Sequence, residues 1–445
     1  MGIAGAGMSA LALIAKSRGV PVTGCDIEPG PASDVADAGI DVFEGHDTGH
    51  VNGVRAVVYT AAVAPEHVEL QAARDAGVPV VRRADALSEA VAGGVLAAIA
   101  GTHGKTTTSA MVTVALRAAG LDPTGIVGGR VDSWGGNASI GKSDLFVVEA
   151  DEYDRAFLSL DPDVAVINNI ESDHLECYGT VAALEAAFAE FGARAGRLMV
   201  GADDRGAARI GRSVNVPTWQ VGLSASADLR ISDVGGGSER NSARLTLPDG
   251  RCLDLALRVP GIHNLRNAAM AVGTTLALDG DVALAAQGLN DFGGVDRRFQ
   301  VLGTSAGVTV VDDYAHHPTE VVVTIGAARQ RYPGRRLVAV FQPHLYSRTQ
   351  SHGEALGIAL AAADIAVVTD VYPAREKPIE GVSGAIVFEA ARRAGAEVEW
   401  ISDLERVPHD LAQLVLSGDV VLTMGAGTIT EVGPALIRRL SGTVA

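Results

Sequence analysis

A glycine-rich turn between a buried strand and a helix constrains the fold of this chain more than any other feature. The apolar run Val95–Ala100 leads directly into GTHGKTTT (101–108), and an apolar helical pattern follows. Backbone N–H groups at such a helix start are unpaired and, together with the helix dipole, favour an anion. Lys105 can reach terminal phosphates, and the Thr106 hydroxyl can ligate magnesium. Ile99 replaces the first glycine of the generic phosphate loop, but the strand–loop–helix context favours phosphate binding over a plain surface turn.

Two further strand patterns end in acidic and imidazole side chains. LFVVEADE (145–152) places Glu149 at a strand end, and the run from 164 to 170 is followed by Asp173 and His174. A carboxylate beside a phosphate loop suits a magnesium ligand or a group that orients water. A solvated acidic turn or a structural histidine is the alternative for either motif alone. Two such strand ends near one phosphate loop favour a shared metal and phosphate site.

Short apolar runs alternate with helical patterns along almost the whole chain, which is typical of parallel sheets covered by helices. The length of 445 residues suggests about three domains. We therefore expect an α/β fold with a Rossmann-like domain at 1–90, a central P-loop ATPase-type domain with a mostly parallel sheet at 91–294, and a Rossmann-like α/β domain at 295–445. The segment 226–257 is richer in Gly and Ser, and we interpret it as an antiparallel excursion.

A second glycine loop opens the chain. GIAGAG (2–7) resembles a dinucleotide loop, and Asp26 lies 19 residues beyond Gly7, where a ribose-binding acid is expected. The usual middle glycine is replaced by Ala4, so the motif is weak by itself. Because Met1 almost adjoins the loop, the strand that should precede it is missing. We therefore expect the natural protein to start upstream and this first domain to be loosened.

The C-terminal third carries two crowded strand ends, DDYAHHPTE (312–320) and FQPHLYSRT (341–349). Ligands of α/β sheets bind outside the carboxyl ends of parallel strands, so these polar groups indicate a site. HNLRN (263–267) could present asparagine amides to adenine, although helix capping by Asn264 explains it equally well. DRRF (296–299) offers arginine forks for phosphate or carboxylate, or a solvated pair.

Charge and cysteine content narrow the class of protein. The net charge is −17 without a basic stripe, which argues against nucleic-acid binding. Cys25, Cys177 and Cys252 are scattered, which argues for a reducing compartment rather than a disulfide framework. No apolar stretch approaches the ~20 residues that span a bilayer, and no signal peptide precedes the first motif. These features predict a cytoplasmic protein without membrane insertion.

Taken together, the motifs resemble those of the Mur ligases. In order along the chain they are GTHGKTTT, EADE, NNIESDH, PGIHNLRN, RRFQ, DDYAHHPTE, FQPHLYSRT and MGAG. The resemblance covers essentially the whole chain and is strongest to the branch that joins L-alanine to UDP-N-acetylmuramate in peptidoglycan precursor synthesis. It implies ATP and Mg²⁺ as cofactors, and a carboxylate that ATP phosphorylates to an acyl phosphate before the amino group attacks.

The resemblance also implies a role for individual residues. The ATP phosphates would be held by Gly101, Thr102, His103, Gly104, Lys105, Thr106 and Thr107. Magnesium would lie among Thr106, Glu149 and His174. Adenine would face Asn264 and Asn267, and the rest of the nucleotide would face Arg298 and Asp313. The muramoyl carboxylate and the amino acid would face Tyr314, His316, His317, His344 and Arg348. UDP would be held by Gly5, Gly7 and Asp26. Catalysis would rest on Lys105, Glu149, His174, His344 and Arg348.

One departure from the family pattern supports the alanine-adding branch. Many members hold a second magnesium with a carbamylated lysine some fifteen residues after the histidine. Here Ala189 occupies that offset, and residues 175–196 contain no lysine. The alanine-adding branch, to which the chain is most similar, also lacks that lysine.

Three alternatives compete with this interpretation. A ligase that recycles a murein tripeptide fits EADEYD but not FQPHLYSRT. A non-catalytic nucleotide-binding subunit is disfavoured because Lys105, Thr106, Glu149 and His174 are all retained. A P-loop switch lacks the generic spacing and an effector region. The preference among L-Ala, Gly and L-Ser, and the choice between monomer and homodimer, stay open.

Overall fold

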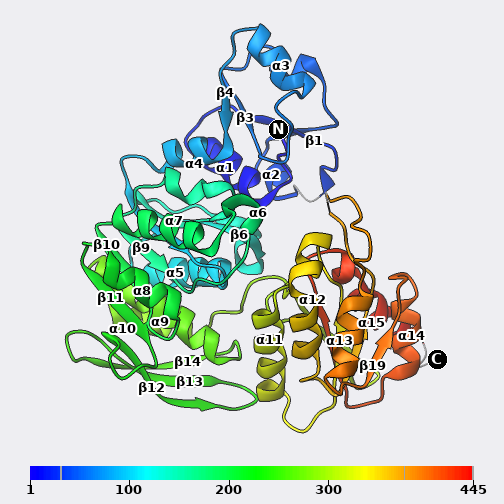
Figure 1. Ribbon diagram of the computed structural model, residues 1–445. Helices are drawn as coiled ribbons and strands as arrows, with labels where there is room; N and C mark the ends of the chain where they lie inside the picture. Colours follow the sequence, from blue (N-terminus) through cyan, green and yellow to red (C-terminus); the bar gives the residue numbers. More distant parts are fainter. Residues whose placement is uncertain (31–32, 375, 443–445) are drawn as a thin grey trace. The chain divides into compact units, whose positions relative to one another are not determined.

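The computed structural model describes residues 1–30, 33–374 and 376–442 (Figure 1). The chain divides into two compact units. The first comprises Met1–Val234, Ala243–Ala256 and Leu265–Phe292, and the second comprises Gly235–Ser242, Leu257–Asn264 and the chain from Gly293 onward. Within the described ranges, every helix is too short or too polar to cross a lipid bilayer.

The largest sheet has ten strands in the order β14-β13-β12-β11-β10-β9-β5-β8-β6-β7. Its strands are β5 (Val95–Ala100), β6 (Thr124–Val131), β7 (Gly136–Ser139), β8 (Leu145–Glu149), β9 (Val164–Ile167), β10 (Arg197–Gly201), β11 (Thr218–Gly222), β12 (Leu229–Gly236), β13 (Asn241–Thr246) and β14 (Cys252–Leu257). β5 pairs in parallel with β8 and with β9, so the three carboxyl ends share one edge. This edge positions the phosphate loop beside the ends of two other strands.

Helices cover this sheet because its central strands are apolar throughout and bury both faces. They are α5 (Lys105–Ala118), α6 (Leu175–Tyr178), α7 (Val181–Ala193), α8 (Arg205–Ser213), α9 (Ile262–Ala277) and α10 (Val282–Leu289). Phe188 and Phe191 of α7 pack with Phe157, and all three side chains are fully buried. Phe157 belongs to the 3-10 segment η4 (Tyr153–Ser159), so this core fixes the chain that follows the end of β8.

The N-terminal part of the first unit contains two small parallel sheets. β1 (Thr23–Asp26) pairs with β2 (Asp41–Glu44), and β3 (Val57–Tyr59) pairs with β4 (Val80–Arg82). The helices are α1 (Ala6–Ser17), α2 (Ser33–Asp37), α3 (Val68–Asp75) and α4 (Arg83–Val91), and the 3-10 segment η2 (Thr48–Val51) precedes β3.

The first three residues connect these two small sheets. The amino group of Met1 donates to Val58 O at 2.7 Å, while Gly2 N and Ile3 N donate to Cys25 O at 2.9 and 3.2 Å. The start of the chain is marked by the N label in Figure 1.

The second unit is built on a six-stranded sheet in the order β15-β16-β20-β17-β18-β19. Its strands are β15 (Gln300–Ser305), β16 (Val308–Asp313), β17 (Leu337–Phe341), β18 (Ile365–Val368), β19 (Val398–Trp400) and β20 (Val420–Met424). All neighbours are parallel except β15, which pairs antiparallel with β16.

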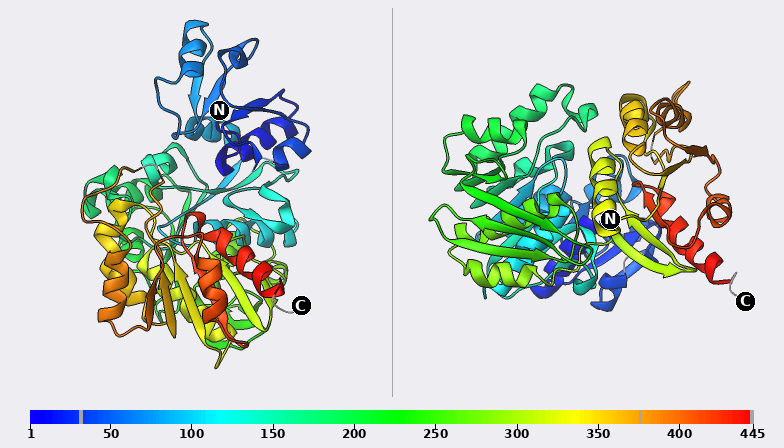
Figure 2. Two further views of the ribbon diagram at one scale, coloured as in Figure 1. Left: turned by 90° about the vertical axis from the view of Figure 1, so that its right-hand side faces the viewer. Right: turned by 90° about the horizontal axis from the view of Figure 1, so that it is seen from below.

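Both faces of the six-stranded sheet are buried, as the alternation of side chains along β17 shows. Ala339 and Phe341 pack on one face with α11 (Pro318–Arg331), α12 (Tyr346–Leu360) and α13 (Ala385–Arg393). Val338 and Val340 pack on the other face with α14 (Val407–Leu414) and α15 (Val432–Gly442). The period of two in a strand therefore produces a three-layer unit (Figure 2).

The fold confirms the expected α/β class with several mostly parallel sheets. Two features differ from the expectation. The edge strands β7 and β15, which pair antiparallel with β6 and β16, were not anticipated, because both have a mixed polar and apolar sequence. The expected antiparallel excursion at 226–257 begins with β12, which instead extends the sheet in parallel with β11.

Candidate active site

The phosphate loop is shaped by two glycines with left-handed backbone. Gly101 has φ +130° and Gly104 has φ +79°. A Cβ atom at Gly101 would lie 3.0 Å from Asn168 N, and one at Gly104 would lie 3.1 Å from the Asn267 side-chain oxygen. Gly104 precedes α5 and has no side chain to cap it. The first N–H groups of the helix are thus left for an anion. Asn267 lies beside the loop, and its contact with adenine stays a prediction.

Lys105 is held in the loop by a buried carboxylate. Its Nζ lies 2.8 Å from both carboxylate oxygens of Glu152 and also donates to Gly101 O at 2.8 Å. Glu152 is 2% exposed, and its backbone oxygen accepts from the Tyr178 hydroxyl at 2.6 Å. Burial opposes the ammonium charge, but the carboxylates of Glu152 and Asp151 prevail and raise the pKa of Lys105. The side chain therefore carries a full positive charge at neutral pH.

Thr106 and Glu149 meet as the sequence predicts for a magnesium site. The Thr106 hydroxyl donates to Glu149 Oε1 at 2.9 Å, and the backbone N–H of Gly128 donates to the other carboxylate oxygen. A Cβ atom at Gly128 would lie 3.0 Å from the same carboxylate and would crowd it. Hydroxyl and carboxylate oxygens are the hard ligands that Mg²⁺ prefers.

His174 occupies the turn before α6. Its φ is +53°, and its ring packs edge-on against the ring of Tyr153 with centroids 5.2 Å apart. Its Nε2 lies 3.9 Å from a carboxylate oxygen of Asp173. Tyr153 directly follows Glu152 in the chain, so His174 belongs to the same strand-end region. Its role as a magnesium ligand stays a prediction.

Two asparagines that were not among the predicted residues organise the loop. Asn169 accepts from His103 N at 2.8 Å through its side-chain oxygen, and Asn168 donates to the hydroxyl of Thr108 at 3.0 Å. Thr102 accepts from Glu171 N at 2.9 Å. The paired asparagines of NNIESDH could have predicted this role. They follow the end of β9, which pairs in parallel with β5, so they lie beside the loop at the end of β5.

The N-terminal glycine loop is joined to its predicted acid. Asp26 Oδ2 accepts from Ala4 N at 2.9 Å, and Gly5 precedes the start of α1. A Cβ atom at Gly7 would lie only 2.6 Å from a guanidinium nitrogen of Arg83. Gly7 is therefore the place where a side chain from α4 crosses the loop.

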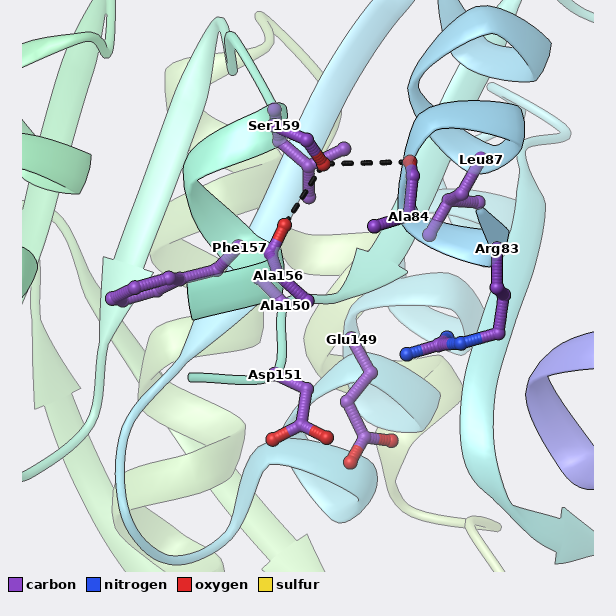
Figure 3. Close-up of a pocket in the computed structure, with 10 residues that line it drawn as sticks. Arg83, Ala84, Leu87, Glu149, Ala150, Asp151, Ala156, Phe157 and Ser159 are labelled. Carbon is purple, nitrogen blue, oxygen red and sulfur yellow. Dashed lines mark hydrogen bonds between the residues drawn. The ribbon is translucent and has the colours of Figure 1, made fainter. Parts of the chain in front are cut away.

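Arg83 also lines a small pocket with Glu149 and Asp151. Figure 3 shows its guanidinium and the Glu149 carboxylate on the same side of that pocket. Ser159 ties η4 to α4 by donating to Ala84 O at 3.4 Å and to Ala156 O at 2.8 Å. Sequence reasoning missed Arg83, because an arginine in RRADAL has no motif around it.

The second unit gathers its predicted residues at the carboxyl ends of parallel strands. His344 follows β17, stacks on the ring of Tyr372 with centroids 5.7 Å apart, and accepts from Arg348 at 3.1 Å through Nδ1. His316 follows β16, with its ring centroid 5.2 Å from that of Tyr314 and 6.1 Å from that of His344. Burial, followed by the charges of His316 and Arg348, lowers the pKa of His344 to about 4. His344 is therefore a neutral acceptor at physiological pH.

Asp313 and His317 both take part in hydrogen bonds within the second unit that hold its backbone. The two Asp313 oxygens accept from Phe299 N at 2.7 Å and Ala315 N at 2.8 Å, and burial raises its pKa to about 6. His317 precedes α11, and its backbone N–H donates to Glu320 in a capping box. The nucleotide and substrate contacts of both residues stay predictions.

The two arginines of DRRF lie over one aromatic ring. The guanidinium carbons of Arg297 and Arg298 lie 4.8 and 5.0 Å from the ring centroid of Tyr314. Arg297, for which the resemblance implied no separate role, also donates to Gly425 O of the MGAG loop at 2.7 Å. Asn264 lies in the first turn of α9, and its side-chain nitrogen donates to Pro260 O at 2.7 Å. This bond joins the helix to the segment that precedes it, and both the capping role and the adenine contact of Asn264 stay predictions.

Comparison with known families identifies the class of protein. The description "Mur ligase family, catalytic domain" matches residues 1–94, "Mur ligase middle domain" matches 99–275, and "Mur ligase, glutamate ligase domain" matches 297–427. The chain belongs to the Mur ligase family.

Individual relatives narrow the comparison within that family. The chain is 44% identical to the UDP-N-acetylmuramate–L-alanine ligase of Kineococcus radiotolerans, covering 99% of this chain and 95% of the relative. It is 42% identical to the enzyme of the same name from Streptomyces avermitilis, covering 99% and 97%. Among solved structures, the UDP-N-acetylmuramate–alanine ligase of Thermotoga maritima superposes with a TM-score of 0.84 at 28% identity, covering 99% and 98%. A murein peptide ligase from Psychrobacter arcticus superposes with a TM-score of 0.73 at 24% identity, covering 100% and 98%, and shares the fold.

Proposed function

We propose that this chain joins L-alanine to the carboxylate of UDP-N-acetylmuramate at the expense of ATP, as one step of peptidoglycan precursor synthesis. The observation that carries the proposal is the near end-to-end match, at 44% identity, to a relative named for that reaction. The paired Thr106–Glu149 and Lys105–Glu152 contacts support it, because a ligase must hold phosphates and a metal at the same strand ends. We further propose the division 1–90, 91–294 and 295–445 as its three domains.

The residues at the phosphate loop fit ATP and magnesium. Gly101 and Gly104 leave space that a Cβ atom would fill, and α5 directs uncapped N–H groups toward it. We propose that this loop with Lys105 holds the ATP phosphates, and that Thr106, Glu149 and His174 hold Mg²⁺. When bound, ATP supplies the phosphoryl group that activates the muramoyl carboxylate, and Mg²⁺ supplies positive charge to the phosphates.

The protein itself contributes charge and alignment to this reaction. Lys105 carries a positive charge that needs no protonation step, since nearby carboxylates hold it protonated. Such preorganised donors stabilise charge that develops in the transition state. Arg83 and the loop at Gly7 would position the UDP-sugar, whose carboxylate must be in line with the phosphate.

The C-terminal cluster would serve the incoming amino acid. Arg348 offers a guanidinium that suits a carboxylate, and it is oriented by the neutral Nδ1 of His344. Tyr314 and His316 face the same cluster. We place the reaction in the cytoplasm, consistent with three scattered cysteines.

A direct assay separates this function from the recycling of murein peptide. Phosphate release from ATP would be measured with UDP-N-acetylmuramate and, in turn, L-alanine, glycine, L-serine or the tripeptide L-alanyl-γ-D-glutamyl-meso-diaminopimelate. We expect release that depends on L-alanine, with the ligated product found by mass spectrometry. Release that requires the tripeptide would overturn the proposal.

A further inference from the structure

A compact group of metal-ligating side chains lies in the N-terminal part of the first unit. Cys25 is the buried residue of β1, His46 follows β2, and Glu69 lies in the first turn of α3. Cys25 is 3% exposed, Glu69 is 1% exposed, and the His46 side chain is 15% exposed. These three residues, which we term the Cys25 cluster, are far apart in the sequence and are distinct from the phosphate loop.

The donor atoms of the Cys25 cluster form a small triangle. Cys25 Sγ lies 3.5 Å from His46 Nδ1 and 3.3 Å from Glu69 Oε2, and His46 Nδ1 lies 3.1 Å from Glu69 Oε2. A tetrahedral zinc site with bonds of about 2.0–2.3 Å places neighbouring ligand atoms about 3.3–3.8 Å apart. The triangle therefore has nearly the dimensions of one face of such a tetrahedron.

A second layer of contacts orients the carboxylate. Glu69 Oε1 accepts from Asp47 N at 2.9 Å and lies 2.6 Å from His50 Nδ1. The ring of His67 packs edge-on against that of His46 with centroids 4.5 Å apart. Metal sites characteristically fix their ligating groups by outer hydrogen bonds of this kind. The His50 ring and the backbone N–H of Asp47 already bond one oxygen of the Glu69 carboxylate. A carboxylate that needed only these hydrogen bonds would not require a thiol 3.3 Å from its other oxygen.

We propose that Cys25, His46 and Glu69 bind a borderline divalent transition-metal ion of the zinc class. One thiolate, one imidazole and one carboxylate are the ligand types that Zn²⁺ accepts, with water completing the tetrahedron. On binding, the thiol of Cys25 releases its proton to solvent as the sulfur–metal bond forms. His46 binds through Nδ1 in the tautomer that carries its proton on Nε2.

The ion would reinforce three elements that already contact one another, since the loop after β2 donates to Asp26 O of β1 and to Glu69 of α3. It would tie β1 to the loop after β2 and to α3, immediately before Asp26, which accepts from the glycine loop. Binding of an ion to the folded protein stabilises it by mass action. The effect is independent of the proposed ligase function, so it can be read without any assay of ligation.

Cobalt substitution tests the proposal on the full-length protein. The chain would be purified with a chelator, loaded with Co²⁺, and examined for the near-ultraviolet band of a thiolate–cobalt bond. We expect the intensity of this band to correspond to one Co²⁺ bound per chain. The band should be absent in Cys25→Ser, and it should disappear when Zn²⁺ displaces Co²⁺. Cys252→Ser is the matched control, because Cys252 is exposed and far from the cluster in sequence. Zinc should also raise the midpoint of thermal unfolding in the wild type but not in Cys25→Ser.

A second measurement does not depend on any variant folding. X-ray absorption of the zinc-loaded wild-type protein should show one sulfur together with nitrogen or oxygen ligands. A zinc environment without sulfur, or a cobalt band that persists in Cys25→Ser, would overturn the proposal. Absence of any tight binding of Co²⁺ or Zn²⁺ would overturn it as well.

Discussion

The ammonium of Lys105 lies 2.8 Å from both carboxylate oxygens of Glu152, so the principal cation of the phosphate loop is paired with a buried carboxylate. The pair is buried, with the Lys105 side chain 13% exposed and that of Glu152 3% exposed. A phosphate that enters this loop meets a lysine whose position and charge are already set. Replacement of Lys105 or of Glu152 tests this preorganisation.

Replacing Lys105 by alanine should reduce ligation by roughly 10²-fold or more, by analogy with the loss of one preorganised donor. The fold should persist at reduced stability, because the loop itself is held by Asn168 and Asn169 while the buried Glu152 carboxylate loses its counter-charge. Steady-state rates and circular dichroism would be compared with those of Lys142→Ala, which removes an exposed lysine. Near-normal turnover in a folded Lys105→Ala protein would contradict the assignment.

Replacing Glu152 by glutamine should destabilise the protein by about 3–5 kcal/mol, because it leaves a buried ammonium without its counter-charge. Nucleotide phosphates should supply that counter-charge. The loss in unfolding midpoint should therefore be smaller with ATP and magnesium than without them. Calorimetric scans of both proteins, with and without the nucleotide, make the comparison. An equal loss under both conditions would show that Lys105 does not meet the phosphates.

Replacing Arg83 by alanine should raise the KM for UDP-N-acetylmuramate while leaving the KM for ATP nearly unchanged. The reason is that its guanidinium crosses the N-terminal glycine loop at Gly7, the loop proposed to hold the UDP-sugar. Arg82→Ala is the matched control, since Arg82 is adjacent and exposed. Initial rates at varied UDP-sugar and varied ATP would measure both constants. A change confined to the KM for ATP would refute this role.

Activity should not depend on bicarbonate. Lysine carbamylation requires carbon dioxide, and Ala189 stands where many family members hold that lysine. Rates would be compared in buffer depleted of carbon dioxide and in buffer supplemented with bicarbonate. A reversible requirement for bicarbonate would mean that a lysine from elsewhere in the chain fills the role.

The contribution of His344 to the stability of the second unit should disappear as the pH falls from about 6.5 toward 4. Burial lowers the folded-state pKa of His344 from 6.5 to about 4, so folding favours the neutral ring. The unfolded chain takes up the proton first, and the stabilisation present above pH 6.5 disappears through this window. Denaturant unfolding at several pH values would show a shallower decline in His344→Gln. An identical pH profile in the variant would refute the shift.

The parts of the site that lie close together along the chain could be predicted from the amino-acid sequence alone. The phosphate loop, its lysine and its threonine could be predicted because strand, turn and helix are consecutive, and their geometry follows from backbone sterics. The α/β class followed equally from the alternation of apolar runs with helical patterns. Glu149 was predicted because it ends a strand, and the parallel pairing of β5 with β8 brings it to Thr106.

Contacts between residues far apart in the sequence became apparent only in the folded structure. Glu152, rather than its neighbours in EADE, turns back to Lys105 because η4 is held by a core of buried phenylalanines. Arg83 reaches Gly7, and Cys25 meets His46 and Glu69, through packing between elements separated by long stretches of chain. Such contacts depend on the register of whole strands and helices, which no local pattern of side chains encodes.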